Sequence, residues 1–369
     1  MKRAPNRLVR RANPRGFTLV ELMVAMVLAL LLLAAIGALY VSSKQTFRVQ
    51  DNTSGIDEVL RAIETDMSSE IRKAGYFGCF RWKDGVTGPA YALTAKKPLS
   101  KLGKFPIPMD SGAPKLGPAY DVRGGTADTT SINPNPQSGV TILPGTEYLS
   151  ISYGQPQAYL KTAMKTGVEP LELNRAITVK DGQPLLLANC DAMTLMRADQ
   201  SGTLSTIAHD PNAGDNDSLG DPKWAYTLFA QGATLMSLQS SVFFLAQKAG
   251  DPPTLYLLTP NDSTNPAQPL ASNVEQLNFL YGVDSGSGLT FKTAAAVTAA
   301  EWPVVRMVKV GVVVRSNDAN VSGTAAGAGV KYTWNSTAGR YDMTNTASDN
   351  YLRKAHVFTV AIRGRSPAI

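Results

Sequence analysis

The N-terminal part of the chain contains one uninterrupted apolar segment. Residues 22–41 read LMVAMVLALLLLAAIGALYV and include no charged side chain. As a helix that rises about 1.5 Å per residue, this segment would span about 30 Å, which is the thickness of the hydrocarbon core of a bilayer. The segment therefore predicts a helix that crosses a membrane.

After the apolar segment, apolar residues recur every three or four positions, as they do on one face of a helix. This stripe consists of Ile56, Leu60, Ile63, Met67, Ile71 and Ala74. No proline occurs in residues 17–88, and Gly75 is a candidate for the C-terminal cap. We expect a single helix from about Thr18 to Ala74, roughly 85 Å long. Its first half would face lipid or a filament, and its second half would pack on the rest of the chain.

The remainder of the chain shows patterns typical of strands. Apolar residues alternate or cluster at residues 149–153, 242–246, 255–258, 277–283, 308–314 and 357–363. Residues 75–144 are rich in Gly, Pro and Lys and predict loops with short strands, and long polar insertions lie at residues 209–222 and 317–351. A helix followed by strands predicts an α+β fold, with an antiparallel β-sheet against the long helix.

The net charge of +7 is concentrated at the N-terminus. Residues 1–16 hold six cations and no acid, and the rest of the chain carries 30 basic against 29 acidic side chains. A nearly neutral body argues against nucleic acid as a partner. The basic flank precedes the apolar segment, so the positive-inside rule predicts a cytoplasmic N-terminus and an exported body. An ordinary secretory signal fits poorly, because its apolar region would be shorter and followed by a small-residue cleavage site.

Cys79 and Cys190 are the only cysteines in the chain. With His209 and His356 they cannot reproduce the spaced ligands of a structural zinc site. In an exported body, two cysteines favour one disulfide, and the alternative is two unrelated buried thiols. A loop of about 110 residues closed by that bond would add roughly 4–5 kcal/mol in the chain-entropy model.

Two further segments were considered as sites. The oxygen-rich residues between Asp210 and Asp221 could hold calcium, but they lack the EF-hand spacing and its closing glutamate, and such clusters are ordinary turn sequences. Residues 321–329 are Gly-rich, fit neither phosphate-binding fingerprint and predict a loop. No catalytic string occurs, and the two histidines are expected to be surface or hydrogen-bonded structural residues. We therefore expect no enzyme, no cofactor and no metal.

Glu21 interrupts the apolar pattern near its start. An ionised carboxylate at membrane depth is costly and is usually paired or functional. The alternative is a carboxylate close enough to the interface to reach water, helped by the positive end of the helix dipole.

The string GFTLVE at residues 16–21, after a basic leader and before an apolar segment, closely resembles the type IV prepilin signature. In that family a prepilin peptidase cuts after the glycine and methylates the new N-terminal residue. The resemblance implies a cut between Gly16 and Phe17, and N-methylation of Phe17. It also implies that Glu21 pairs with the terminal amine of a neighbouring subunit, which would select the axial register. The alternative partner is its own amine, four residues back.

Three later strings resemble PilW-type minor pilins: RKAGYFGC at residues 72–79, the strand at residues 308–316, and FTVAIRGR at residues 358–365. The usual Arg-Asn-Arg ending of that family reads Arg-Gly-Arg here. The chain also lacks the helix-bending proline of many major pilins, which leaves Gly37 as the soft point of the membrane segment.

The resemblance implies four regions: a cleaved leader (1–16), a transmembrane or filament-core helix (17–41), its amphipathic continuation (42–75) and a β-rich periplasmic or extracellular domain (76–369). It implies a minor pilin that crosses the inner membrane once, joins a hetero-oligomeric extracellular filament and helps to prime assembly near the tip. The implied partners are other minor pilins, the major pilin, the prepilin peptidase, the assembly platform protein and a large tip adhesin. The alternatives are a minor pseudopilin of a type II secretion system, a tip adhesin subunit and a signal-anchored periplasmic enzyme.

Overall fold

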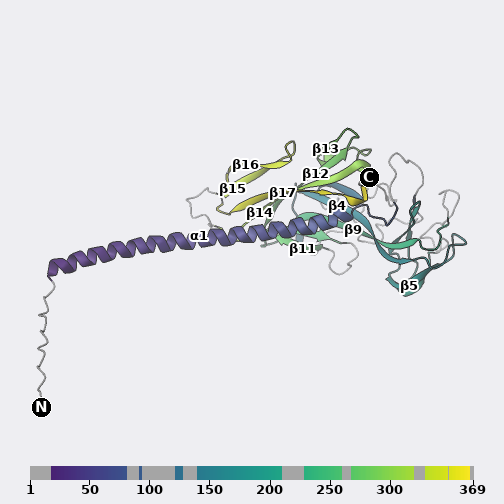
Figure 1. Cartoon of the computed structure of the whole chain (residues 1–369), viewed down its shortest axis with the longest axis horizontal. Helices are drawn as coiled ribbons and strands as arrows, with labels where there is room; N and C mark the ends of the chain where they lie inside the picture. The colour runs from purple at the N-terminus through teal and green to yellow at the C-terminus, as the bar shows by residue number, and fades with distance from the viewer. Residues whose placement is uncertain are drawn as a thin grey trace, which may run out of the picture.

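A long helix leads into a β-rich body (Figure 1). The computed structural model describes residues 18–80, 91–93, 121–127, 139–209, 228–259, 267–319, 329–347 and 349–365. Helix α1 spans Leu19–Lys73, with Thr18 as its N-cap and Ala74 as its C-cap, which confirms the predicted single helix. Gly75 follows with a φ of +69°. Its N–H donates to the carbonyl oxygen of Ser152 at 3.0 Å, so the chain passes directly from the helix onto a sheet.

The body contains two main sheets. The larger one has nine strands: β1 (Tyr91–Leu93), β2 (Val122–Thr126), β3 (Val140–Ile142), β4 (Glu147–Tyr159), β6 (Pro184–Ala188), β7 (Met193–Arg197), β9 (Thr234–Lys248), β10 (Thr254–Leu258) and β11 (Ala267–Ser272). The smaller one has the order β13 (Leu289–Lys292), β12 (Val274–Asp284), β14 (Val305–Arg315) and β17 (Arg353–Ala361). All described pairings are antiparallel except that of β1 with β7. The α+β class predicted from the sequence is confirmed.

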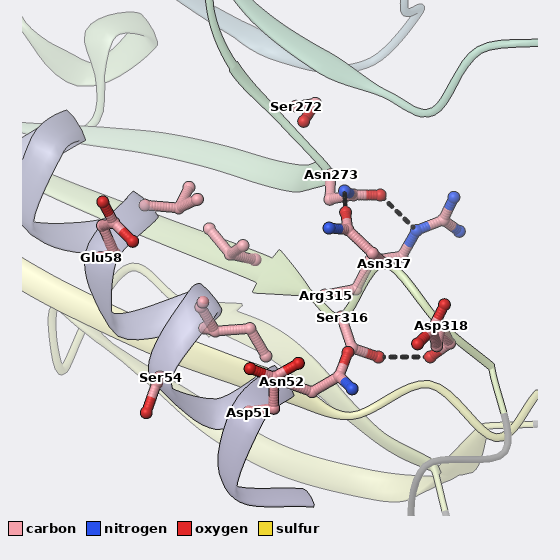
Figure 2. A pocket seen from close by; sticks show the side chains of 14 residues that line it. Asp51, Asn52, Ser54, Glu58, Ser272, Asn273, Arg315, Ser316, Asn317 and Asp318 are labelled. Carbon is pink, nitrogen blue, oxygen red and sulfur yellow. Dashed lines mark hydrogen bonds between the residues drawn. The ribbon is translucent and has the colours of Figure 1, made fainter. Parts of the chain in front are cut away.

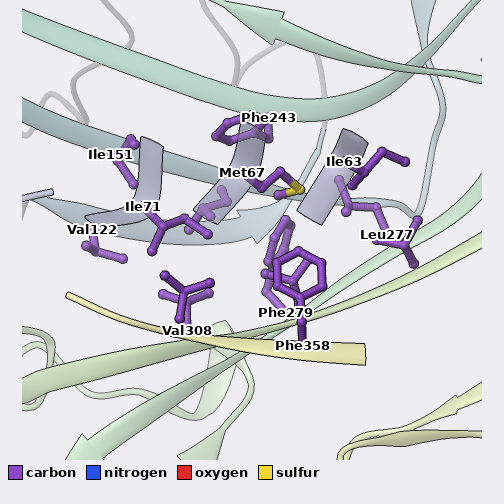
Figure 3. Close-up of a cluster of buried hydrophobic side chains, with 14 of the residues drawn as sticks. Ile63, Met67, Ile71, Val122, Ile151, Phe243, Leu277, Phe279, Val308 and Phe358 are labelled. Atoms are coloured by element: carbon purple, nitrogen blue, oxygen red, sulfur yellow. The ribbon is translucent and has the colours of Figure 1, made fainter. Parts of the chain in front are cut away.

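The second half of α1 lies between these two sheets (Figure 3). All six residues of the predicted apolar stripe are buried, and Met67 and Ile71 are fully inaccessible. Phe243 of β9 packs on one side of the helix and Phe358 of β17 on the other. The sequence predicted one sheet against the helix, whereas the helix end is enclosed by two.

In strand β4, apolar and small polar residues alternate, but both faces of the strand are buried. Its Leu149 and Ile151 are buried in the same core as the helix stripe, but Ser150 and Ser152, on the other face, are only 3% exposed. At Gly154, on the same face as the serines, a Cβ atom would lie 2.8 Å from the sulphur of Met236 and 3.4 Å from Phe77. The small residues of β4 therefore mark a second packed face and not a solvated one.

A distal lobe occupies the end of the body farthest from the start of α1 (Figure 1). It is built from β6, β7, part of β4 and the two-stranded sheet of β5 (Leu171–Val179) and β8 (Gly202–Ile207). It has its own apolar core, which includes Leu160, Leu173, Ile177, Met196, Phe229 and Leu235. The sequence patterns did not predict this lobe.

A hairpin lies in the insertion that was expected to be polar loop. Strands β15 (Gly329–Asn335) and β16 (Arg340–Ala347) pair with each other. Trp334 and Tyr341 pack against Gly311 of β14, where a Cβ atom would lie 2.6 Å from the Trp334 ring and 3.0 Å from the Tyr341 ring. Two aromatic side chains therefore convert a polar segment into a cover for the four-stranded sheet.

Gly311→Ala is expected to lower the free energy of unfolding by about 1–3 kcal/mol, because the added methyl group must displace the two rings. Gly55→Ala is the matched control. Gly55 lies in α1 with no atom within 4 Å of its added Cβ position, so alanine there should stabilise by up to about 1 kcal/mol. Denaturant unfolding measures the stability of both variants. Equal unfolding midpoints for Gly311→Ala and Gly55→Ala would rule out the packing of the two rings against Gly311.

Candidate functional site

The start of α1 is closed by a reciprocal capping box between Thr18 and Glu21. The N–H of Glu21 donates to Oγ1 of Thr18 at 3.2 Å. In return, the N–H and the hydroxyl of Thr18 donate to Oε2 of Glu21 at 3.1 and 3.0 Å. This arrangement satisfies helix-terminal donors that otherwise lack partners. Glu21 therefore has a partner within its own helix that the sequence interpretation did not include. Gly16 and Phe17 lie outside the described residues.

The first half of α1 stands clear of the body (Figure 1). Its large apolar side chains, from Leu19 to Val41, are all more than half exposed. Within the described part of the chain, α1 is the one helix that is long and apolar enough to cross a membrane. An apolar surface of this size requires lipid or other protein to cover it.

The end of α1 is held by the last described turn of the chain, η6 (Arg363–Arg365). A Cβ atom on Gly364 would lie 2.6 Å from the carbonyl oxygen of Gly75 and 3.0 Å from that of Ala74. The glycine of the Arg-Gly-Arg ending therefore allows the C-terminal segment to touch the backbone at the helix end.

Arg365 is buried beside this contact. Its guanidinium lies 3.8 Å from the carboxylate of Asp121, which is itself fully buried. It also donates to the carbonyl oxygen of Trp302 at 2.6 Å. Burial lowers the pKa of Arg365 to about 10, and Asp121 opposes that change, so the group stays cationic at neutral pH. The pair joins the C-terminus of the chain to the start of β2, next to the helix junction.

Both sheets also hold the polar flanks of α1. From β17, Lys354 pairs with Asp57, and His356 lies 2.9 Å from Glu64. On the nine-stranded side, Glu70 accepts hydrogen bonds from Ser241 at 3.1 Å and from Tyr153 at 3.3 Å. His356 is thus a hydrogen-bonded structural residue, as predicted. His209 is another, because it is buried and its Nε2 lies 2.9 Å from the carbonyl oxygen of Glu169.

Cys79 and Cys190 form a disulfide, with their Cα atoms 4.7 Å apart. The bond ties the segment that follows α1 to the turn between β6 and β7, and so connects the helix junction to the distal lobe.

The other candidate sites show no metal-binding or catalytic arrangement among the described residues. The segment considered for calcium, residues 210–221, lies outside the described residues, as does most of the Gly-rich loop. Among the described residues, no three His, Cys, Asp or Glu side chains are grouped to hold a metal ion. A polar hollow of about 530 Å³ lies between α1 and the ends of β11 and β14, and Figure 2 shows the side chains that line it. Asp51, Glu58, Asn273 and Asp318 line it, and they do not form a recognisable catalytic arrangement.

The described part of the chain thus combines an uncovered apolar helix, closed at its start by Thr18 and Glu21, with a β-rich body that encloses the other end of the helix. Residues 11–37 match the prokaryotic N-terminal methylation motif. Residues 242–364 match PilW, the type IV pilus-assembly protein W, and the two matches together are consistent with a PilW-like type IV prepilin. No match is found among curated proteins or among solved structures. The matched families are structural pilus components and not enzymes.

The PilW match covers a defined part of the β-rich body. It runs from the second half of β9 to η6 and so contains the whole four-stranded sheet and Gly364, which touches the backbone at the helix end. The distal lobe, whose core lies between Ala158 and Leu235, falls outside it, as do the helix contacts of Ser152, Tyr153 and Ser241. The similarity thus covers one of the two sheets that enclose the helix.

Proposed function

We propose that this protein is a minor type IV pilin that is cut between Gly16 and Phe17, is N-methylated at Phe17 and joins the filament near its tip to help prime assembly. Before assembly it waits in the inner membrane, with the leader in the cytoplasm and the body on the other side. The observation that carries the proposal is the uncovered apolar helix, which begins at Thr18 and Glu21 and is attached to a PilW-like body. Other minor pilins, the major pilin, the peptidase, the platform protein and a tip adhesin are its expected partners.

The capping box supports a role for Glu21 in docking. Both hydrogen bonds from Thr18 end on Oε2, so Oε1 has no partner among the described residues. Cleavage before Phe17 would place a cationic amine at the end of the same helix. In a packed bundle of apolar helices, an ionised carboxylate is costly unless it meets a cation. An amine from a neighbouring subunit can pair with Oε1 while the capping box stays intact, and this pairing would favour one axial register.

Glu21→Gln is expected to leave cleavage intact and to reduce incorporation into pili at least tenfold. Glutamine also forms capping boxes, so this variant removes the charge and keeps the helix start. Thr18→Val is the matched control, because it removes the cap, which contributes about 0.5–2 kcal/mol, and keeps the carboxylate. Quantitative blotting of sheared filaments measures incorporation. Normal incorporation of Glu21→Gln would contradict the docking role.

Peptide mass spectrometry of sheared filaments and of inner membranes tests the proposed function as a whole. Methylated Phe17 as the first residue in the filament fraction is the expected result. The same peptide confined to membranes would indicate a pseudopilin of a secretion system instead. An uncut leader in both fractions would reject the processing.

The distal lobe favours one additional role, that of a tip adhesin subunit. It has a core of its own and lies at the end of the body farthest from the membrane helix. Surface binding by wild-type filaments, compared with filaments that lack this chain, tests the role, and equal binding would reject it.

A further inference from the structure

A short stretch of α1 is uncovered by the body although it lies beyond the apolar segment. Tyr40 is 67% exposed and Phe47 is 70% exposed. Lys44 and Arg48 are exposed as well, and the four side chains lie on one side of the helix together with Ser43 and Asp51. In this part of the chain neither cation has an acidic partner among the described residues. We call these four residues the interfacial face.

The position of the interfacial face relative to the apolar segment sets its depth in a membrane. Val41 ends the apolar run, and Lys44 is the first charged residue after it. At about 1.5 Å per residue, the backbone of Lys44 lies about 4–5 Å beyond it and that of Arg48 about 10 Å beyond it. The headgroup layer extends about 5–8 Å outside the hydrocarbon core. Helical side chains point toward the N-terminus, which here is toward the membrane. Both cationic groups can therefore reach the level of the phosphates.

The two aromatic residues fit the same depth. Tyr40 lies at the end of the hydrocarbon layer, where tyrosine is enriched in membrane proteins because its ring is apolar and its hydroxyl polar. Phe47 would expose an apolar ring to water if nothing covered it. The glycerol region of a lipid would contact the Tyr40 ring, and the Phe47 ring, whose backbone lies about 9 Å beyond Val41, would reach back to the headgroup layer.

We propose that the interfacial face binds the phosphate of an anionic phospholipid while the subunit resides in the membrane. Lys44 and Arg48 are one turn apart, so both can contact one phosphate, and the guanidinium can do so with two parallel hydrogen bonds. Each of the two cations should raise the affinity of the interfacial face for an anionic lipid about fivefold. The inference rests on the proposed function only in that α1 spans a membrane. It implies that a subunit exchanges a lipid for protein contacts when it enters a filament.

The acidic group closest to this face is Asp51, one turn further along α1 and exposed. Its position, about 15 Å beyond Val41, lies outside the headgroup layer. A parallel helix of a second copy in the same register would instead place Lys44 against Lys44 and Arg48 against Arg48. A lipid phosphate therefore matches the charge of this face better than an unshifted neighbouring helix does.

The test uses the full chain in vesicles of phosphatidylcholine with a minor fraction of phosphatidylglycerol, followed by native mass spectrometry of the released protein. The ratio of phosphatidylglycerol to phosphatidylcholine adducts should fall at least fivefold in Lys44→Gln/Arg48→Gln relative to the wild type. The leader cations are the same in every variant, so they do not affect the comparison.

Arg61→Gln/Arg72→Gln is the matched control. It removes the same charge from exposed positions on the same helix, but these positions lie about 30 Å or more beyond Val41. Its adduct ratio should equal that of the wild type. Lys44→Arg/Arg48→Lys should also retain the preference.

Two outcomes would overturn the inference. One is an unchanged ratio in Lys44→Gln/Arg48→Gln, and the other is an equal fall in the control. If the ratio is unchanged and that variant is also lost from filaments, the face belongs to subunit contacts. Because N-terminal processing at Phe17 is measured separately, failure of the lipid site does not reject the proposed pilin function.

Discussion

Arg365→Met is expected to lower the free energy of unfolding by about 3–5 kcal/mol, one of the largest effects of a single substitution in this protein. The substitution removes the buried cation that lies beside the carboxylate of Asp121 and the donor to the carbonyl oxygen of Trp302. Breaking a buried ion pair on one side typically has this cost, because the remaining charge stays buried. Denaturant unfolding followed by tryptophan fluorescence measures the change.

Arg363→Met is the control for Arg365→Met. Arg363 is in the same turn but is exposed, so its replacement should change stability by less than about 0.5 kcal/mol. The double variant Asp121→Asn/Arg365→Met should lose less stability than the sum of the two single variants, because the charges are removed together. Equal effects of the two arginine substitutions would contradict the structural role of Arg365.

Cys79→Ser/Cys190→Ser is expected to lower the free energy of unfolding by about 2–5 kcal/mol. The two cysteines are 111 positions apart, so the bond closes a long loop and restricts the unfolded chain. The wild type treated with a reductant should unfold at the same denaturant concentration as the variant. The variant itself should not respond to the reductant. A wild-type midpoint that is insensitive to reduction would show that the bond does not contribute.

The helix was predictable because its signals are local. The stripe from Ile56 to Ala74 repeats with the helical period, and all its members are buried. The capping box was also readable, since Thr18 and Glu21 have the spacing of that motif. The sequence interpretation considered an amine as the partner of the Glu21 charge and did not include Thr18 of the same helix.

The two-sheet enclosure of α1 was not predictable in the same way. Strand pairing joins residues that are far apart in sequence, and alternation reports one buried face only when the other face is solvated. In β4 both faces are buried, so Ser150 and Ser152 indicated solvent wrongly. The pairing of Asp121 with Arg365 carries no local signal at all. The β15–β16 hairpin did have a local signal, because Tyr332 and Trp334 alternate with polar residues. The polar composition of the surrounding segment obscured that signal.

The contacts between α1 and the C-terminal segment have a consequence for the order of events during synthesis. The helix is made well before β17 and η6, which cover one side of its stripe. Until those residues arrive, the second half of the helix keeps an uncovered apolar surface and the junction at Gly75 stays open. A chain that stops before Arg353 therefore cannot enclose its helix, however well its other strands have paired. Closure of the body around α1 therefore requires that synthesis has passed Arg365, and before that point the second half of the helix has no fixed support on one of its sides.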